Sequence, residues 1–153
     1  MLLSDFIDQS RIVLDIPDNG KEEIIRALVK KIASGNKKLN EQQAVKAVYD
    51  RENLGSTGIG EGIAIPHAKF DFIEDPIVAV GVSKDGLNFE AIDNLPVHIV
   101  ILILGPSEDD HHSKYLELMK HTTRLLKQDV LRREIAEATR AADVKGIIRK
   151  YES

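Results

Sequence analysis

The chain has 153 residues, 42% of them hydrophobic and 30% charged, with a net charge of −4 at pH 7. This length suits one domain with its own hydrophobic core. The absence of cysteine excludes disulfides and thiolate chemistry, and the interspersed acidic and basic residues argue against binding to nucleic acid, which needs a basic face.

The N-terminal residues and the apolar runs bear on the cellular location. The start of the chain lacks the basic region and the long apolar core of a secretory signal. The most apolar run, 99–104, is far shorter than the roughly 18 residues of a membrane span. We therefore expect a soluble, cytoplasmic protein with no direct insertion into the membrane.

Periodicity in the first third of the chain predicts one strand and two helices. β-Branched residues over 12–16 indicate the strand. Asn19 and Asn40 each stand three residues before a Glu or Gln, as in a capping box, so helices are expected over 20–33 and 40–52. The first helix should bury an apolar stripe made of Ile24, Ile25, Leu28, Val29 and Ile32.

The rest of the chain alternates strands with helices. Strands are expected over residues 63–66, 77–82, 86–89 and 97–104, and helices over 112–127, from 129 and over 143–150. The run over 97–104 is apolar almost throughout, as in a strand buried on both faces. The helix over 112–127 should bury Leu116, Met119, Thr123 and Leu126. The pattern predicts an α/β fold, a single-domain layered sandwich over residues 1–153 with a mixed β-sheet flanked by α-helices.

A glycine-rich loop between residues 53 and 62 is the first functional signal. Its glycines surround Ser56 and Thr57, and such a loop can direct several backbone amides at one anion. It does not match a P-loop, because Glu61 and Gly62 stand where Lys and Ser or Thr are required. It does not match a dinucleotide-binding loop either, because a strand follows instead of a helix. The alternative is a structural turn that is rich in glycine.

His67, at the end of the short strand that follows the loop, is the second signal. A histidine fixed there after a proline suits a nucleophile or a proton carrier, although an inert, hydrogen-bonded histidine is the alternative. Helical phase directs Arg51 to the mouth of the loop, and a phosphoryl group on imidazole needs such a non-titrating cation. The combination predicts a phosphohistidine site, with donors from Ser56, Thr57 and Gly58. One ring nitrogen of His67 should be held by a backbone carbonyl or a carboxylate.

Four polar residues before the helix over 112–127 leave two alternatives open. His111 and His112 are either exposed surface residues or a source of one further group for the His67 site. With Asp109 and Asp110 they are also a conceivable metal site, which would indicate a metal hydrolase. Adjacent histidines point apart on a helix or strand and chelate poorly. We therefore expect no metal and no cofactor.

Two segments resemble a known family. They are Arg51-Glu52 followed by Leu54-Gly55-Ser56-Thr57-Gly58-Ile59-Gly60, and Ile63-Ala64-Ile65-Pro66-His67-Ala68. Both are similar to the signature of the type-2 enzyme IIA of the bacterial phosphotransferase system, the fructose/mannitol family that includes nitrogen-regulatory IIA proteins. The resemblance implies a phosphotransferase component that accepts a phosphoryl group on His67 from phospho-HPr or an HPr-like protein. It also implies that Arg51 and a second histidine, for which His112 fits better than His111, steady the phosphate.

The resemblance leaves two fates open for the phosphoryl group. It passes to a IIB partner that serves a IIB/IIC permease, or it switches the binding of a regulatory target, as in a nitrogen-type IIA protein. Because the chain has no cysteine for a IIB-type phosphocysteine and no membrane span, the next partner is expected on another chain.

Overall fold

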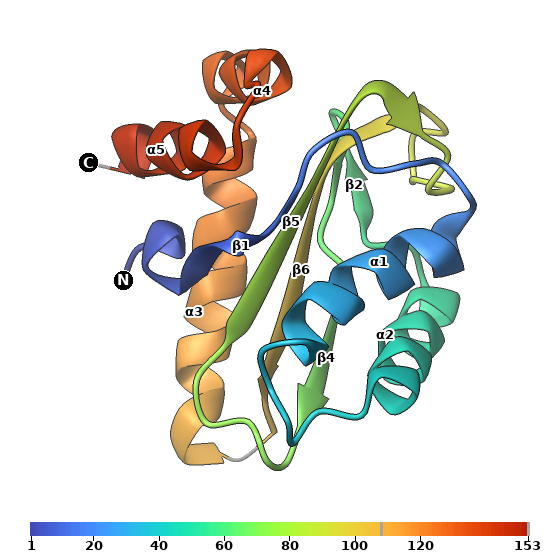
Figure 1. Cartoon of the computed structure of the whole chain (residues 1–153), viewed down its shortest axis with the longest axis vertical. Coiled ribbons are helices and arrows are strands. Elements are labelled where there is room, and N and C mark those ends of the chain that lie inside the picture. Colours follow the sequence, from blue (N-terminus) through green and yellow to red (C-terminus); the bar gives the residue numbers. More distant parts are fainter. Residues whose placement is uncertain (108, 153) are drawn as a thin grey trace.

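The computed structural model arranges the chain in layers around a mixed sheet (Figure 1). It describes residues 1–107 and 109–152, with the backbone alone for 109–113. The elements run in the order η1 (Leu3–Phe6), β1 (Ile7–Val13), α1 (Lys21–Ala33), α2 (Glu41–Leu54), β2 (Gly58–Gly60), β3 (Ile63–Ala64), β4 (His67–Phe70), β5 (Ile77–Leu87), β6 (Val97–Pro106), α3 (Asp109–Leu126), α4 (Asp129–Glu137) and α5 (Ala141–Glu152).

The strands form one sheet in the order β1-β5-β6-β3-β2, and β4 also pairs with β6. The pairs β5/β6 and β2/β3 are antiparallel, whereas β1 runs parallel to β5, and β3 and β4 run parallel to β6. This topology confirms the predicted mixed sheet. It places the short strands β3 and β4 end to end along the same side of β6.

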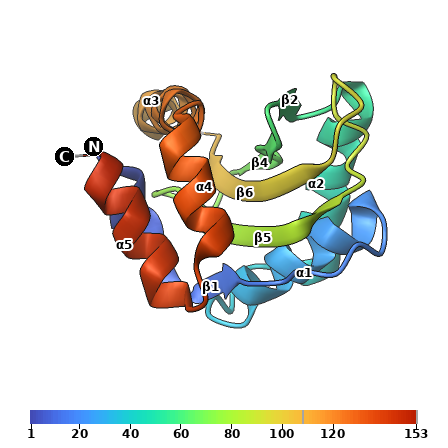
Figure 2. The same ribbon diagram turned by 90° about the horizontal axis from the view of Figure 1, so that it is seen from above.

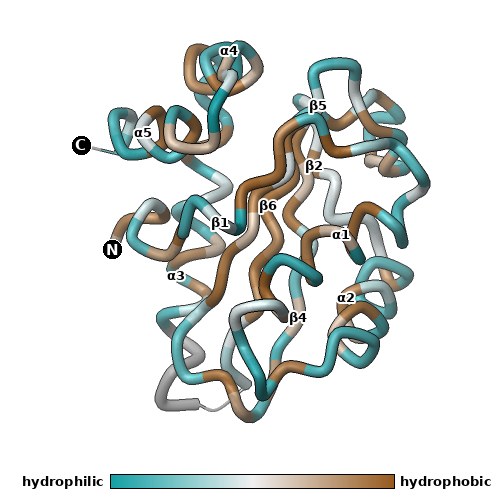
Figure 3. The backbone as a smooth tube through the Cα atoms, viewed as in Figure 1, coloured by the Kyte–Doolittle hydropathy of each residue, from teal (hydrophilic) through white to brown (hydrophobic). Residues whose placement is uncertain are grey.

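Helices cover both faces of the sheet, with α1 and α2 on one side and α3, α4 and α5 on the other (Figure 2). Along β6, Val100, Leu102 and Leu104 pack in the α1/α2 core, while the alternating residues Ile99, Ile101 and Ile103 pack in the core of the other layer. All six are at most 1% exposed, so β6 is buried on both faces as predicted. Figure 3 shows the same arrangement as a hydrophobic centre between polar outer surfaces.

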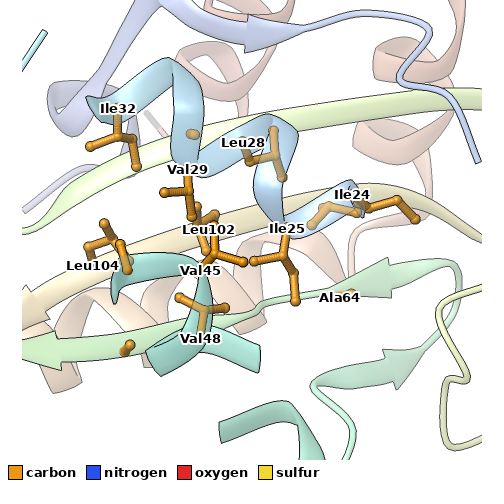
Figure 4. Packing of buried hydrophobic residues seen from close by; sticks show 14 of the residues in the cluster. Ile24, Ile25, Leu28, Val29, Ile32, Val45, Val48, Ala64, Leu102 and Leu104 are labelled. Atoms are coloured by element: carbon orange, nitrogen blue, oxygen red, sulfur yellow. The ribbon is translucent and has the colours of Figure 1, made fainter. Parts of the chain in front are cut away.

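The helix α1 packs its predicted apolar stripe onto the sheet and onto α2 (Figure 4). Each of the five predicted residues is at most 2% exposed. The two capping predictions had different outcomes. Asn40 caps α2 by accepting a hydrogen bond from the Gln43 amide at 2.9 Å. The prediction for Asn19 was wrong, because α1 begins after Gly20, whose φ of 97° turns the chain into the helix without a side-chain cap.

Other elements also differ from the predictions. The strands expected over 77–82 and 86–89 are one strand, β5, the strand expected over 63–66 is limited to β3, and β2 and β4 were not predicted. β1 ends at Val13 and begins at Ile7, so it includes polar residues such as Asp8 that face solvent on an edge strand. In α3 Leu126 is buried as predicted, but the other buried residues lie one position before those predicted. The buried stripe consists of Tyr115, Leu118, Thr122, Leu125 and Leu126, whereas Leu116 is 49% exposed. Tyrosine and threonine within the buried stripe hid it from a search for aliphatic residues. Over the residues that the structure describes, no helix is both long and apolar enough to cross a membrane.

Gly105 in β6 allows α3 to approach the sheet closely, which gives a stability prediction. A methyl group at residue 105 would overlap the ring of Tyr115, whereas one at Gly146 in α5 would meet no atom within 4 Å. Overpacking of this kind costs about 1–3 kcal/mol, so Gly105→Ala should lower the free energy of unfolding by that amount. The control Gly146→Ala should raise it by roughly 0.5–1 kcal/mol, because alanine is the better helix former. Denaturant unfolding measures both, and equal midpoints for the two variants would contradict the close contact.

Candidate functional site

His67 lies at the junction between β3 and β4, which pair with β6 one after the other. Pro66 has no amide hydrogen, and the ladder is interrupted between β3 and β4 at this residue. The Pro66 carbonyl still accepts a hydrogen bond from the amide of Ile103 at 3.0 Å, which ties the junction to the buried strand. His67 is therefore the first residue of β4, half-buried, on backbone that is anchored on both sides of the junction.

The imidazole of His67 has a defined tautomer. Its Nδ1 lies 2.8 Å from the carbonyl oxygen of Ile65. Because a carbonyl only accepts hydrogen bonds, Nδ1 carries the proton, and in the neutral ring Nε2 carries the lone pair. The prediction that one ring nitrogen is held by a backbone carbonyl or a carboxylate is confirmed.

His67 opens into a cleft of about 420 Å³ that it shares with Arg51. The described residues that line the cleft are Ala47, Arg51, His67, Ala68, Lys69, Tyr115 and Leu116. Arg51 lies on the last turn of α2, where its Nη1 donates a hydrogen bond to the Gly55 carbonyl at 3.0 Å. The structure thus brings together the predicted histidine and the predicted arginine. Leu116, which is half exposed, gives the cleft an apolar margin.

A second cleft, of about 430 Å³, is less suited to an anion. The charged residues that line it are Asp18, Asp85 and Glu90, all acidic. Charges of this sign would repel a phosphoryl group. Of these two clefts, the one shared by His67 and Arg51 is therefore the better suited to an anion.

The environment of His67 favours the neutral ring. Burial lowers the pKa of His67, the positive charges of Arg51 and Lys69 lower it further, and the hydrogen bond to Ile65 and the charge of Glu52 oppose these effects. At pH 7 the ring is neutral and Nε2 is a nucleophile. Burial also raises the pKa of Tyr115, so its phenol stays protonated, and its ring centre lies 6.3 Å from that of His67.

The glycine-rich loop supports the cleft from behind. Ser56, Thr57 and Gly58 are not among the described residues that line the cleft. Thr57 donates both its amide, at 2.8 Å, and its hydroxyl to the carboxylate of Glu52. The Gly58 amide donates to the hydroxyl oxygen of Ser56 at 3.0 Å. The amides of Thr57 and Gly58 and the Thr57 hydroxyl are therefore used within the loop in this conformation, which differs from the predicted direct contact with phosphate.

No other histidine whose side chain the structure describes lines the cleft. His111 and His112 belong to the first turns of α3, and their side chains lie outside the described residues, as do those of Asp109 and Asp110. His98 is half-buried in β6, with Nδ1 at 2.9 Å from the Ser83 carbonyl. Among the described side chains, no three potential metal ligands come together.

The sequence reasoning missed three residues around the cleft. Lys69 lies two residues beyond His67 in the same strand, and the two-residue period of a strand could have placed it on the same side. Tyr115 was missed because the predicted buried stripe of α3 was shifted by one residue and included Leu116 instead. Glu52 is charged and adjacent to Arg51, and no local signal showed that it is 3% exposed.

The fold and the cleft define a class of protein. It is an α/β sandwich in which a neutral histidine with one available nitrogen shares an open cleft with an arginine. Such a cleft suits the transient binding of an anionic group that is delivered from outside.

Comparisons with known proteins identify the family. Residues 5–151 match the family described as phosphoenolpyruvate-dependent sugar phosphotransferase system, EIIA 2, and the chain belongs to this family. It is 35% identical over 153 residues to the PTS system fructose-specific EIIABC component of Bacillus subtilis, covering 99% of this chain but only 24% of that protein. It is 36% identical over 118 residues to the nitrogen regulatory protein of Escherichia coli, covering 75% of this chain and 68% of that protein. The solved structure of the nitrogen regulatory protein IIA-Ntr from Neisseria meningitidis matches with a TM-score of 0.86 at 24% identity, over 95% of this chain and 98% of that chain.

The lowered pKa of His67 gives a prediction for titration. We expect its pKa below the usual 6.5, and we expect Arg51→Met to raise it, because one positive charge is removed. The unfolded chain then binds this proton first as the pH falls, so His67 destabilises the native state below about pH 6.5. NMR titration of the ring measures the pKa directly. A pKa of 6.5 or above in the native protein would contradict the argument from burial.

Proposed function

We propose that this chain is a phosphocarrier that accepts a phosphoryl group on Nε2 of His67 from phospho-HPr or an HPr-like protein. The observation that carries the proposal is the hydrogen bond from Nδ1 to the Ile65 carbonyl, because it leaves Nε2 as the nucleophile in a cleft shared with Arg51. Membership of the EIIA 2 family supports the same chemistry. The unit of function is the single domain over residues 1–153, in the cytoplasm.

The transfer needs little from the protein beyond position and charge. The Nε2 lone pair forms the new N–P bond while the N–P bond of the donor histidine breaks, and that electron pair stays on the donor nitrogen. The proton stays on Nδ1, hydrogen-bonded to the Ile65 carbonyl, throughout the transfer, so the tautomer does not change. Arg51 and Lys69 offset the charge on the transferred group. An open cleft lets a second protein bring its own histidine to the same phosphorus atom.

The phosphoryl group has two possible destinations, and each has support from a relative. The Bacillus subtilis relative is named an EIIABC component, which favours a IIB partner of a IIB/IIC permease. The Escherichia coli relative is named a nitrogen regulatory protein, which favours a regulatory target whose binding depends on the phosphorylation of His67. Incubation of the phosphorylated protein with purified IIB proteins distinguishes between the two destinations. Loss of the phosphoryl group to a IIB protein indicates transport.

A second histidine from the start of α3 completes the proposed site. His112 is the candidate from the family pattern, and it stands four residues before Leu116, which is half exposed. His111 stands four residues before Tyr115, which lines the cleft and is 3% exposed. Because residues four apart share a helix face, this spacing makes His111 an equal candidate.

The assignment of His67 and Arg51 is tested by phosphorylation. With labelled phosphoenolpyruvate, enzyme I and HPr, the wild-type chain should take up one phosphoryl group and His67→Ala none. Arg51→Ala should slow the uptake by more than about 10-fold, because the charge that develops in transfer loses its cation. Arg26→Ala, which breaks only surface ion pairs on α1, is the matched control and should react at the wild-type rate. Label on His67→Ala would remove His67 as the acceptor.

The two candidates for the second histidine are separated by paired variants. His111→Ala and His112→Ala are compared in the same assay, and the variant that removes a contact to the phosphoryl group should be about 10-fold slower or more. The other variant should keep the wild-type rate and serves as its control. Wild-type rates for both variants would show that α3 contributes no histidine to the transfer.

A further inference from the structure

A buried carboxylate lies directly beside Arg51 in the sequence but on the other side of α2. The side chain of Glu52 is 0% exposed, and it accepts hydrogen bonds from the amide of Thr57, at 2.8 Å, and from the Thr57 hydroxyl. The Nζ of Lys21, from the first turn of α1, lies 2.9 Å from its other oxygen. This carboxylate therefore joins α1, α2 and the glycine-rich loop.

Lys21 compensates the charge of this carboxylate inside the protein. The lysine side chain is only 12% exposed, and its Nζ lies 5.0 Å from the centre of the Phe89 ring. A cation near the N-terminus of a helix is opposed by the helix dipole, so this position indicates that Glu52 supplies the compensating attraction. A buried carboxylate without its cation would be strongly destabilising. The Nζ of Lys21 also lies 3.9 Å from a carboxylate oxygen of Glu90, but that side chain is 79% exposed, so the buried partner is Glu52.

A continuous series of contacts leads from Glu52 to the imidazole of His67. The Thr57 amide and hydroxyl donate to Glu52, and the Thr57 carbonyl accepts a hydrogen bond from the Ile65 amide at 3.0 Å. The carbonyl of the same Ile65 accepts the hydrogen bond from Nδ1 of His67 at 2.8 Å. Hydrogen bonds thus link Glu52 through Thr57 and Ile65 to Nδ1 of His67.

The backbone around Thr57 has little freedom to compensate for a loss of Glu52. Gly58, the next residue, is buried, and a side chain there would come within 2.7 Å of the Ala91 Cβ. The carbonyl of Gly58 also accepts a hydrogen bond from the Ile92 amide at 3.1 Å. The loop is therefore packed from the outside by the segment around Ala91 and held from the inside by Glu52.

We infer that Glu52 is a positioning residue for phosphoryl transfer, which acts through Thr57 and the Ile65 peptide to keep the proton of His67 on Nδ1 and the lone pair on Nε2. The transfer itself rests on the proposed function, but the position of the proton does not. Loss of the carboxylate frees the Thr57 amide and hydroxyl, the loop moves relative to Ile65, and the ring of His67 populates both tautomers. Because Nδ1 faces the Ile65 carbonyl, a ring whose lone pair is on Nδ1 cannot offer it to the phosphoryl group, so the acceptor rate falls.

The test uses variants that separate two effects of the carboxylate, its acceptance of hydrogen bonds from Thr57 and its negative charge. Glu52→Ala removes the acceptor for Thr57. The double variant Glu52→Gln with Lys21→Met removes both charges but keeps an amide oxygen for Thr57 to donate to. Thr57→Val removes only the hydroxyl hydrogen bond, and Thr57→Ser restores it. Asp50→Asn is the matched control, since it breaks only the exposed Lys46–Asp50 pair on the same helix.

Two measurements are made on each variant. The nitrogen chemical shifts of the His67 ring report which nitrogen is protonated, and they need no phosphoryl donor. The rate of phosphorylation reports the function. We expect a mixture of tautomers and a rate about 10-fold or more lower in Glu52→Ala, by analogy with the 10–100-fold effects of residues that orient functional histidines. The wild-type tautomer and rate should be kept in three variants: the Glu52→Gln/Lys21→Met double variant, Thr57→Ser and Asp50→Asn. Thr57→Val should give a tautomer mixture and a rate intermediate between those of the wild type and Glu52→Ala.

The outcomes decide the inference even if one variant does not fold. If thermal unfolding shows that Glu52→Ala is unfolded, the comparison of Thr57→Val with Thr57→Ser decides. A single Nδ1–H tautomer in every folded variant overturns the positioning role, whatever the rates. If the wild-type chain takes up no phosphoryl group, the proposed function fails, while the nitrogen shifts still test the link from Glu52 to His67.

Discussion

The function we propose sets one requirement on the site, that an imidazole stay neutral beside cations and then carry a group with about two negative charges. Arg51 serves both stages. Its positive charge lowers the pKa of the free His67 ring, and the same charge would attract a phosphoryl group attached to that ring. The hydrogen bond from Nδ1 to Ile65 is compatible with both stages, because it would keep the proton away from Nε2 before and after the proposed transfer. The cleft therefore needs no rearrangement of protons between its two states.

Arg51 and Glu52, which are adjacent in α2, have different electrostatic roles. Arg51 lies in the cleft, where its charge acts on His67, and Glu52 lies in the interior, where its charge is matched by Lys21. If the carboxylate lay in the cleft, it would neutralise Arg51 and repel the phosphoryl group. Burial behind the loop lets it organise the backbone instead. The same separation explains why the hydrogen-bond donors of Thr57 are directed inward, to Glu52, and not to the cleft.

Features set by local periodicity could be predicted from the sequence, and features set by tertiary packing could not. The stripe of α1 and the doubly buried β6 follow from the spacing of large aliphatic residues, and the Asn40 cap follows from contacts within a few residues. The pairing of Arg51 with His67 followed from helical phase and from the residues around the loop. The inward turn of Glu52 depends on Lys21, which is 31 residues away, and no local pattern reports such a distant partner. The phase of α3 depends on the space that Gly105 leaves for Tyr115.

The contact between Gly105 and Tyr115 connects the fold to the chemistry of the cleft. Glycine at 105, which pairs directly with Lys69 of β4 in the ladder, lets the Tyr115 ring lie against β6, and the ring then forms one wall beside His67. A larger residue at 105 would move α3 outward and widen the cleft, which would expose the imidazole to water. Because burial is the largest cause of the lowered pKa of His67, a wider cleft would raise that pKa and reduce the fraction of neutral ring. The packing of one helix against the sheet thus controls the nucleophile as well as the stability of the protein.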